Sequence, residues 1–391
     1  MNISPSFPED DTSVGLYIHV PFCKARCSYC GFVSNIHSLD LEERYLRSVA
    51  AEIGLRAGDH MAGGAALSCD TIYFGGGTAS LLPPDKVLRV IETCKTWFEI
   101  SDHPEITIEI NPGTVDRSCL SQFIHAGVNR VSLGVQSLVN AELAAMGRLH
   151  DSSQALSAYR DLRQAGFDNV SVDLIAGFPG QTVESVRHSL RLILELRPEH
   201  LSVYLLEIKS GTRLAAMMAA GAVPPQDEDM VADMYDEICE ITVNAGYEQY
   251  EISNFAVPGR FSRHNMKYWT DQVYIGFGPG AHGMTGRHRY ANMESLDLYE
   301  QALDKGFLPV ETVTEMTPEM RFKDALIMGL RLVKGIDLDL IARRYGVDAR
   351  AFVLETIGDL QSFGLFEIRK NTLRLTAKGR LLSNVVFGRW V

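Results

Sequence analysis

Short apolar runs of strand length alternate with segments whose apolar residues recur at helical spacing over the first half of the chain. The pattern predicts strands at residues 16–20, 70–74, 105–110, 130–135, 170–175 and 201–205, and helices at residues 40–56 and 84–98, from residues 116, 140 and 152, and at residues 182–196. Repeated strand–helix units form a parallel sheet. We therefore expect an α/β fold with a partial (β/α)6 barrel, similar to a TIM barrel, in which chemistry gathers where the strands end.

The alternation breaks after residue 209. Residues 210–225 predict a short helix and a loop, residues 229–245 an amphipathic helix, and residues 247–252 an edge strand. We divide this part of the sequence into an N-terminal tail at residues 1–13, a partial barrel at residues 14–209 and an extension of that barrel at residues 210–316.

Residues 317–391 predict a separate α+β domain. Helical patterns cover residues 318–332, 337–345 and 349–363, two short strands follow at residues 365–369 and 372–375, and a last helix begins in TAKGRLL. This order is typical of a winged helix. The domain has 13 Lys and Arg against 8 Asp and Glu residues, but Arg343, Arg344, Arg369 and Lys370 form no recognition-helix cluster, so we do not expect it to bind nucleic acid.

The composition is that of a soluble globular protein. Of 391 residues 46% are hydrophobic and 22% charged, and the formal charge of −12 disfavours general binding to nucleic acid or anionic lipid. No apolar run approaches the ~20 residues that span a bilayer, and the polar, acidic start is unlike a signal peptide. Four cysteines, Cys69, Cys94, Cys119 and Cys239, are scattered like reduced, buried thiols, so we expect a cytoplasmic protein.

Three further cysteines, Cys23, Cys27 and Cys30, follow the first strand at C-x3-C-x2-C spacing. A [4Fe–4S] cluster bound by three thiolates keeps one iron without a protein ligand, free to hold another molecule. The same cysteines could hold zinc with His19 or His37 as the fourth ligand, or could remain unligated. The spacing favours the cluster.

Polar residues and glycines gather at the predicted strand ends. The second strand runs into Gly75-Gly76-Gly77-Thr78, where the lack of side chains lets backbone approach a ligand. Glu109 ends the third strand, Gln136 follows the fourth, and Asp173 interrupts the apolar fifth. A carboxylate on a buried strand needs a partner because its desolvation is costly.

Two segments of the extension contain candidate binding-site residues. The stretch HNMKYW places His264 beside an amide and two large aromatics, which suits a flat apolar macrocycle whose iron takes a histidine ligand, although such aromatics usually pack in a core. The stretch GFGPGAHG, which ends near His282, lacks the ending of a phosphate loop. We expect it to close over one end of the site.

The first segment carries a family resemblance. The stretch YIHVPFC, followed by CSYCGF, resembles the cluster loop of the radical S-adenosylmethionine (SAM) family, within the branch of oxygen-independent coproporphyrinogen III oxidases and HemW heme chaperones. The resemblance implies that the open iron binds SAM and that an electron from the cluster breaks a carbon–sulfur bond. It implies the following residues around SAM: Tyr17, Tyr29, Gly76, Gly77, Thr78, Glu109, Gln136, Arg148 and Asp173. Glu109 and Asp173 would accept hydrogen bonds from ribose hydroxyls or the ammonium, and Arg148 would bind the carboxylate.

The oxidases carry a fourth cysteine where this sequence has Phe32, and a longer segment before Tyr17. Both departures favour a heme chaperone that binds the cluster, SAM and heme, with His264 of the HNxxYW pattern as heme ligand. Heme-acceptor proteins, respiratory enzymes among them, and an electron donor would be its partners, and it would be a monomer or homodimer. Two alternatives stay open: the oxidase itself, an enzyme that decarboxylates propionate side chains, and a winged-helix redox regulator containing a cluster.

Overall fold

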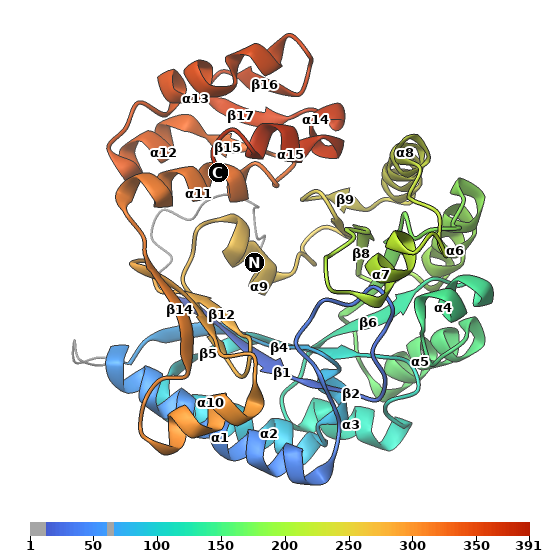
Figure 1. Ribbon diagram of the computed structural model, residues 1–391, viewed down its shortest axis with the longest axis vertical. Coiled ribbons are helices and arrows are strands. Elements are labelled where there is room, and N and C mark those ends of the chain that lie inside the picture. The colour runs from blue at the N-terminus through green and yellow to red at the C-terminus, as the bar shows by residue number, and fades with distance from the viewer. Residues whose placement is uncertain (1–12, 61–65) are drawn as a thin grey trace.

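The computed structural model describes residues 13–60 and 66–391, so nearly all of the predicted N-terminal tail lies outside the described residues. In this part of the chain one sheet has 12 strands, in the order β14-β13-β12-β11-β1-β4-β5-β6-β7-β8-β10-β9 (Figure 1). Its central strands are β1 (Val14–Val20), β4 (Ser68–Gly76), β5 (Glu99–Ile110), β6 (Arg130–Gln136), β7 (Val170–Ala176) and β8 (His200–Leu205), and they pair in parallel. The sheet ends in two free edges, so the barrel is partial, as predicted.

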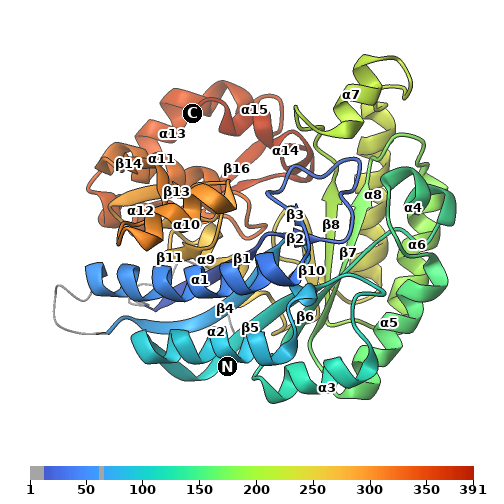
Figure 2. The same cartoon turned by 60° about the horizontal axis from the view of Figure 1, so that its bottom comes forward.

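Helices cover the convex face of the sheet (Figure 2). They are α1 (Leu39–His60), α2 (Pro84–Trp97), α3 (Arg117–His125), α4 (Asn140–Met146), α5 (Ser152–Ala165), α6 (Val183–Leu196) and α8 (Glu228–Asn244). In β1, Leu16 and Ile18 are fully buried in the core beneath them. Alternate residues such as Tyr17 face the concave side because side chains in a strand point alternately to its two faces. The apolar half of the pattern therefore builds the core, and the polar half lines the barrel.

The extension adds strands to both edges of the barrel sheet. After α7 (Arg213–Ala219), the strands β9 (Glu248–Gln249) and β10 (Asn254–Ala256) continue the sheet beyond β8. The helix α9 (Arg263–Trp269) follows, and β11 (Tyr274–Phe277) then pairs in parallel with β1. The strands β12 (His282–Met284), β13 (His288–Asn292) and β14 (Val310–Glu315) are antiparallel, with α10 (Leu296–Asp304) between the last two. The edge strand predicted at residues 247–252 is shorter than expected.

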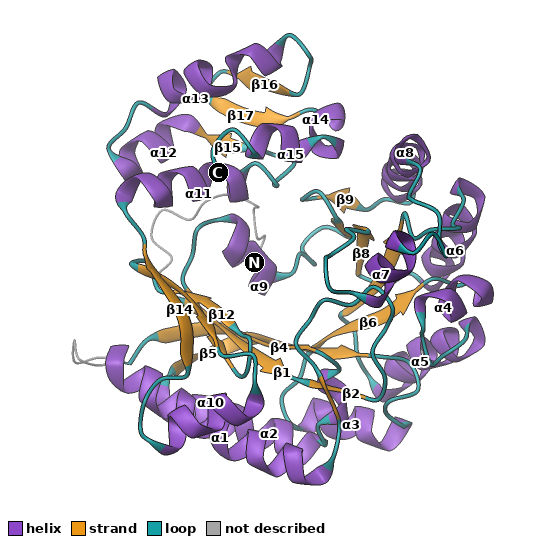
Figure 3. Ribbon diagram, in the orientation of Figure 1, coloured by secondary structure: helices purple, strands orange, loops and turns teal. Residues whose placement is uncertain are grey.

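The C-terminal elements form a separate core of their own, at the top of Figure 3. They are α11 (Pro318–Gly329), β15 (Ile336–Asp337), α12 (Leu338–Tyr345), α13 (Ala349–Ile357), β16 (Phe366–Arg369), β17 (Thr372–Leu375), α14 (Ala377–Leu381) and α15 (Ser383–Phe387). The helix predicted at residues 349–363 ends at Ile357 and gives way to a 3-10 turn, because Gly358 weakens an α-helix. The exact boundaries of the domains stay predictions.

Two short elements carry the cysteine loop. The strand β2 (Phe22–Cys23) pairs in parallel with β3 (Asn35–Ile36), and a 3-10 helix, η2 (Ala79–Leu81), follows the glycines of β4. Among the described residues no helix is both long and apolar enough to cross a bilayer.

Candidate cofactor site

A cavity of about 570 Å³ opens at the C-terminal ends of the parallel strands, between the cysteine loop and the ends of β4 to β8. Eleven of the residues predicted for the site line it: Cys23, Cys27, Tyr29, Cys30, Gly76, Gly77, Thr78, Glu109, Gln136, Arg148 and Asp173. They come from segments far apart in sequence, and the parallel strands bring them together because the carboxyl ends of such strands share one edge. Tyr17 and His264 do not line this cavity.

The three cysteines of the loop are free thiols, and hydrogen-bond donors face two of them. Thr78 Oγ1 lies 3.7 Å from Cys23 Sγ, and Arg148 Nη1 lies 3.5 Å from Cys27 Sγ. Burial raises the pKa of the Cys30 thiol, and a bound cation would oppose this shift. Iron binds the thiolate form of cysteine, which accepts hydrogen bonds from donors such as these.

The described residues include no group of three His, Cys, Asp or Glu side chains placed around a single metal ion. A [4Fe–4S] cube does not require such a group, because each of its irons takes one thiolate at a separate corner. All three cysteines line this cavity, where each could supply one thiolate to a separate corner of the cube.

The two histidines considered as a fourth zinc ligand have other partners. His19 Nε2 lies 3.0 Å from Val33 O and its Nδ1 3.2 Å from Tyr17 Oη, and burial lowers the His19 pKa. His37 Nε2 lies 2.8 Å from a carboxylate oxygen of Glu42. Since a structural zinc site requires four closed ligands, this arrangement favours the cluster over zinc.

The glycines at the end of β4 allow close packing. Gly76 adopts a φ of 115°, in the left-handed region, and donates its N–H to Glu109 Oε2 at 3.2 Å. A Cβ on Gly77 would lie 2.5 Å from Phe22 O, and the Gly77 N–H binds Val20 O. Both amides are thus already used inside the protein. The glycines let the end of β4 lie against the cysteine loop, and their exposed surface still lines the cavity.

Two half-buried acids lie on the cavity floor. Glu109 accepts a hydrogen bond from Tyr73 Oη at 3.0 Å, and Asp173 accepts one from Ser132 Oγ at 2.8 Å. Burial and, next, the negative charge of Asp173 raise the Glu109 pKa to about 7, and burial also raises the Asp173 pKa. A cationic ligand in the cavity would offset this repulsion and favour the ionised pair.

Asn111 was not among the predicted site residues. Its Oδ1 accepts a hydrogen bond from Arg148 Nη2 at 2.5 Å, and its Nδ2 donates to Thr78 Oγ1 at 2.9 Å. Asn111 therefore connects Arg148 and Thr78, the two residues that face Cys27 and Cys23. Asn111 comes two residues after Glu109, so the period of two in a strand could have found it.

Tyr17 lies one layer below the cavity. Its ring stacks on Tyr73, with ring centroids 6.1 Å apart, and it lies within 3.1 Å of the position that a Cβ on Gly75 would take. Tyr17 therefore supports the cavity floor, and its assignment to SAM stays a prediction.

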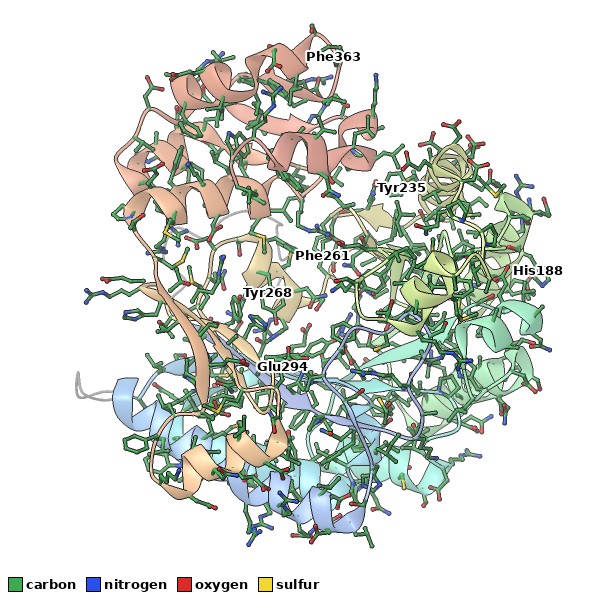
Figure 4. All side chains as sticks on the ribbon, viewed as in Figure 1. His188, Tyr235, Phe261, Tyr268, Glu294 and Phe363 are labelled. Carbon is green, nitrogen blue, oxygen red and sulfur yellow. The ribbon has the colours of Figure 1, made fainter. Side chains whose placement is uncertain are left out.

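His264 belongs to α9, which lies between the sheet and the C-terminal elements, as the labelled Tyr268 marks in Figure 4. His264 is 1% exposed, its Nδ1 lies 2.8 Å from Thr71 Oγ1, and its Nε2 lies 2.8 Å from Tyr268 Oη. Burial lowers its pKa to about 3, so the ring is neutral. A neutral imidazole suits iron, but ligation requires one of these hydrogen bonds to break, and heme binding by His264 stays a prediction.

The expectation that GFGPGAHG closes over the site is wrong, since this stretch does not line the cavity. It builds β11 and the turn that follows. A Cβ on Gly278 would lie 2.4 Å from His19 O, so this glycine permits the close approach to β1.

Comparisons with known proteins agree with this architecture. The Radical SAM superfamily matches residues 17–193, and the HemN C-terminal domain matches residues 316–382. Heme chaperone HemW of Bacillus subtilis is 34% identical, with 95% of this chain and 97% of that protein covered, and heme chaperone HemW of Lactococcus lactis is 31% identical, with 96% of each covered. The mouse mitochondrial radical S-adenosyl methionine domain-containing protein 1 is 39% identical over 75% of this chain and 67% of its own length.

Among solved structures, coproporphyrinogen III oxidase from Escherichia coli, a radical SAM enzyme, covers 99% of this chain and 91% of its own, with a TM-score of 0.83 and 24% identity. At that identity the likeness shows the fold alone. The near full-length similarity to the bacterial proteins goes further: the chain belongs to the HemW family of the radical SAM superfamily.

Proposed function

We propose that this protein is a cytoplasmic heme chaperone that binds a [4Fe–4S] cluster, SAM and heme, and transfers heme to acceptor proteins. The observation that carries the proposal is that three loop cysteines and two half-buried acids, Glu109 and Asp173, line one cavity. The similarity to proteins named heme chaperone HemW supports the heme part of the proposal. Phe32, at the position of the fourth cysteine in the oxidases, further supports a chaperone.

A cluster held by Cys23, Cys27 and Cys30 supplies one iron that can bind the amino and carboxylate groups of SAM. The guanidinium of Arg148 lies against Cys27 Sγ, and Asn111 holds that guanidinium in place. Glu109 and Asp173 face the same space and accept hydrogen bonds from hydroxyl or ammonium groups. A cation bound there would lower the raised pKa of Glu109 and favour its ionised form.

The redox-regulator alternative gains no support from the C-terminal domain. Arg344 pairs with the Asp271 carboxylate at 3.4 Å, and Arg369 donates to Glu367. These cations are therefore partly neutralised by partners within the protein, and phosphate backbones would have to compete for them.

The test is anaerobic reconstitution of the wild-type protein and a Cys27→Ala variant, followed by iron analysis and titration with hemin. We expect about four irons per wild-type chain, a shifted Soret band on hemin binding, and transfer of that heme to apomyoglobin. Cys27→Ala should lose its iron because one corner of the cube has no ligand.

A second variant and a product assay complete the design. His264→Ala should weaken hemin binding while it retains iron; unchanged affinity would assign another heme ligand. Formation of protoporphyrinogen from coproporphyrinogen III and SAM would overturn the chaperone in favour of the oxidase. Full iron content in Cys27→Ala would contradict the cluster site.

A further inference from the structure

A row of buried polar side chains lies on β7 and β8, which run side by side (Figure 2). Ser171 on β7 is the register partner of His200 on β8, and both are fully buried. Neither of them lines the cofactor cavity, whereas Asp173, two residues after Ser171, does. Buried polar groups require hydrogen-bond partners, so the partners of His200 indicate its role.

Hydrogen bonds join His200 to groups on both sides of its ring. Its Nδ1 lies 2.8 Å from Ser171 Oγ, which donates to Asp173 Oδ1 at 3.2 Å. Its Nε2 lies 2.8 Å from Tyr250 Oη, and this oxygen accepts a hydrogen bond from the N–H of Ser262, the N-cap of α9, at 3.4 Å. A continuous chain of hydrogen bonds therefore connects the start of α9 with a carboxylate of the cavity.

The donors and acceptors of this chain fit in only one direction. The Ser262 N–H can only donate, and among the described residues Tyr250 Oη has just one other partner, His200 Nε2. The Tyr250 hydroxyl therefore gives its proton to Nε2, because the reverse would leave that buried proton without an acceptor. A neutral imidazole whose Nε2 accepts must donate from Nδ1, so Ser171 Oγ accepts there and gives its own proton to Asp173.

This direction requires a neutral His200 ring, and the surroundings keep it neutral. Burial and, next, the positive charge of Arg130 lower the His200 pKa well below its ordinary value. Arg130 is itself 1% exposed, so little solvent screens its charge. A protonated ring would donate from both nitrogens and would turn the Tyr250 proton away from the chain. The neutral form protonated at Nδ1 is therefore the one that fits.

The chain ends on a carboxylate whose buried side is held by donors. Burial raises the Asp173 pKa, and hydrogen bonds from Ser132, Ser202 and Ser171 oppose the rise. Of these serines only Ser132 lines the cavity. Ser202 Oγ also lies 3.3 Å from Ser171 Oγ, but an ionised carboxylate is the stronger acceptor for both hydroxyls. Donors on the buried side thus fix Asp173 and leave its other lone pairs for a ligand in the cavity.

We propose that His200 is a positioning residue for SAM, because through Ser171 it holds the Asp173 carboxylate ready to accept hydrogen bonds from the ribose hydroxyls or the ammonium of that ligand. The inference rests on the proposed function, since it takes SAM as the ligand of the cavity. The Ser262 N–H fixes the direction of the chain. A group in the extension thereby orients an acceptor in the barrel.

The first measurement is the tautomer of His200 in the protein without cofactors, by long-range ¹H–¹⁵N NMR of protein labelled at its histidines. The His200 signals are those that disappear in His200→Asn. We expect a neutral ring protonated at Nδ1, with a bare Nε2 whose signal shifts in Tyr250→Phe, where only the hydroxyl is removed. A ring protonated at Nε2, or at both nitrogens, would reverse the chain and overturn the proposal.

The second measurement is the affinity of the cluster-reconstituted protein for SAM, in a double-mutant cycle. Ser171→Ala and His200→Leu should each weaken SAM binding about tenfold, because Asp173 loses an oriented, charge-assisted hydrogen bond in either variant. The double variant should stay within about twofold of Ser171→Ala, since both changes break the same chain. Losses that multiply to about a hundredfold would show two independent structural effects and would overturn the proposal.

A conservative variant and a control separate positioning from packing. His200→Asn supplies an amide donor near the place of Nδ1 and should keep SAM affinity within about threefold of the wild type. A loss as large as that of His200→Leu would assign the effect to packing instead. Thr242→Val removes a buried hydroxyl that is bonded to Ile238 O in α8, far from the chain in sequence, and should bind SAM like the wild type.

The remaining outcomes distinguish the two proposals. Unchanged SAM affinity in Ser171→Ala and His200→Leu would overturn the role of His200 alone. A wild-type protein that holds a full cluster and does not bind SAM would overturn the proposed function together with this role, whatever the tautomer of His200.

Discussion

At the scale of single residues, Glu109 has the most consequential environment. Its pKa is raised from the ordinary value of 4.5 to about 7, by burial first and by Asp173 second. The folded state therefore holds this proton more tightly than the unfolded chain does. The stability that the protonated acid contributes is complete below about pH 4.5 and is lost as the pH rises through about 7.

We predict that Glu109→Gln removes this loss of folding stability at high pH. In the protein without cofactors, the free energy of unfolding at pH 8 should exceed that of the wild type by about 2 to 3 kcal/mol, with little difference near pH 4.5. Urea unfolding across that pH range measures it. The exposed Glu319→Gln serves as control, with an effect below about 0.5 kcal/mol. Parallel curves for Glu109→Gln and wild type would show that folding does not raise the Glu109 pKa.

At the scale of elements, the attachment of β11 to β1 depends on Gly278. This residue has a φ of 99°, donates its N–H to Glu52 Oε2 at 2.8 Å, and leaves no room for a side chain beside His19 O. Gly246 has a similar φ of 89° but nothing within 4 Å of an added Cβ. A side chain at Gly246 would meet backbone strain alone, whereas one at Gly278 would meet the same strain and also a steric clash.

Gly246→Ala should lose about 1 kcal/mol of stability, because the alanine is strained only by the left-handed backbone conformation. Gly278→Ala should lose roughly 2 to 4 kcal/mol, since overpacking adds to the same strain. Thermal unfolding monitored by circular dichroism measures both. Equal losses would mean that β11 shifts freely and that its contact with β1 is not tightly packed.

At the scale of the whole molecule, the C-terminal domain docks on the residues that follow α9. Asp271 accepts hydrogen bonds from Arg321 at 3.0 Å and from Tyr345, and its backbone oxygen accepts one from Arg344 at 3.1 Å. Nearby, Arg331 lies over the Trp269 ring, 4.4 Å from its centroid. The helix that carries His264 is thus held by the barrel on one side and by the C-terminal domain on the other.

We expect Asp271→Asn to weaken this docking by about 1 to 3 kcal/mol, because Arg321 and Arg344, whose guanidinium nitrogens lie 3.0 Å and 3.4 Å from the Asp271 carboxylate, lose their counter-charge. Hydrogen exchange should become faster in α9 and along the docked face of α11, while the core of the C-terminal domain keeps its protection. Asp359→Asn, which breaks an exposed pair with Arg389, is the control and should change nothing measurable. Faster exchange throughout the domain would instead indicate that Asp271 stabilises its fold.

The sequence by itself determined the features that depend on local periodicity and spacing. Alternating strand and helix patterns predicted the parallel partial barrel, and the polar residues at the strand ends predicted most of the cavity wall. The spacing of Cys23, Cys27 and Cys30 predicted a cluster loop. These features are visible in sequence because each is set by residues a few positions apart, or by the shared edge of parallel strands.

Only the tertiary structure decided which contacts form between segments that are far apart in the sequence. It paired β11 with β1, engaged the amides of Gly76 and Gly77 inside the protein, and buried His264 with both ring nitrogens hydrogen-bonded. It also left Phe32 and Ile36 exposed beside basic residues. Burial and hydrogen-bond partners arise from contacts between residues far apart in the chain, and desolvation, which shifts the pKa of Glu109, exists only once those contacts have formed.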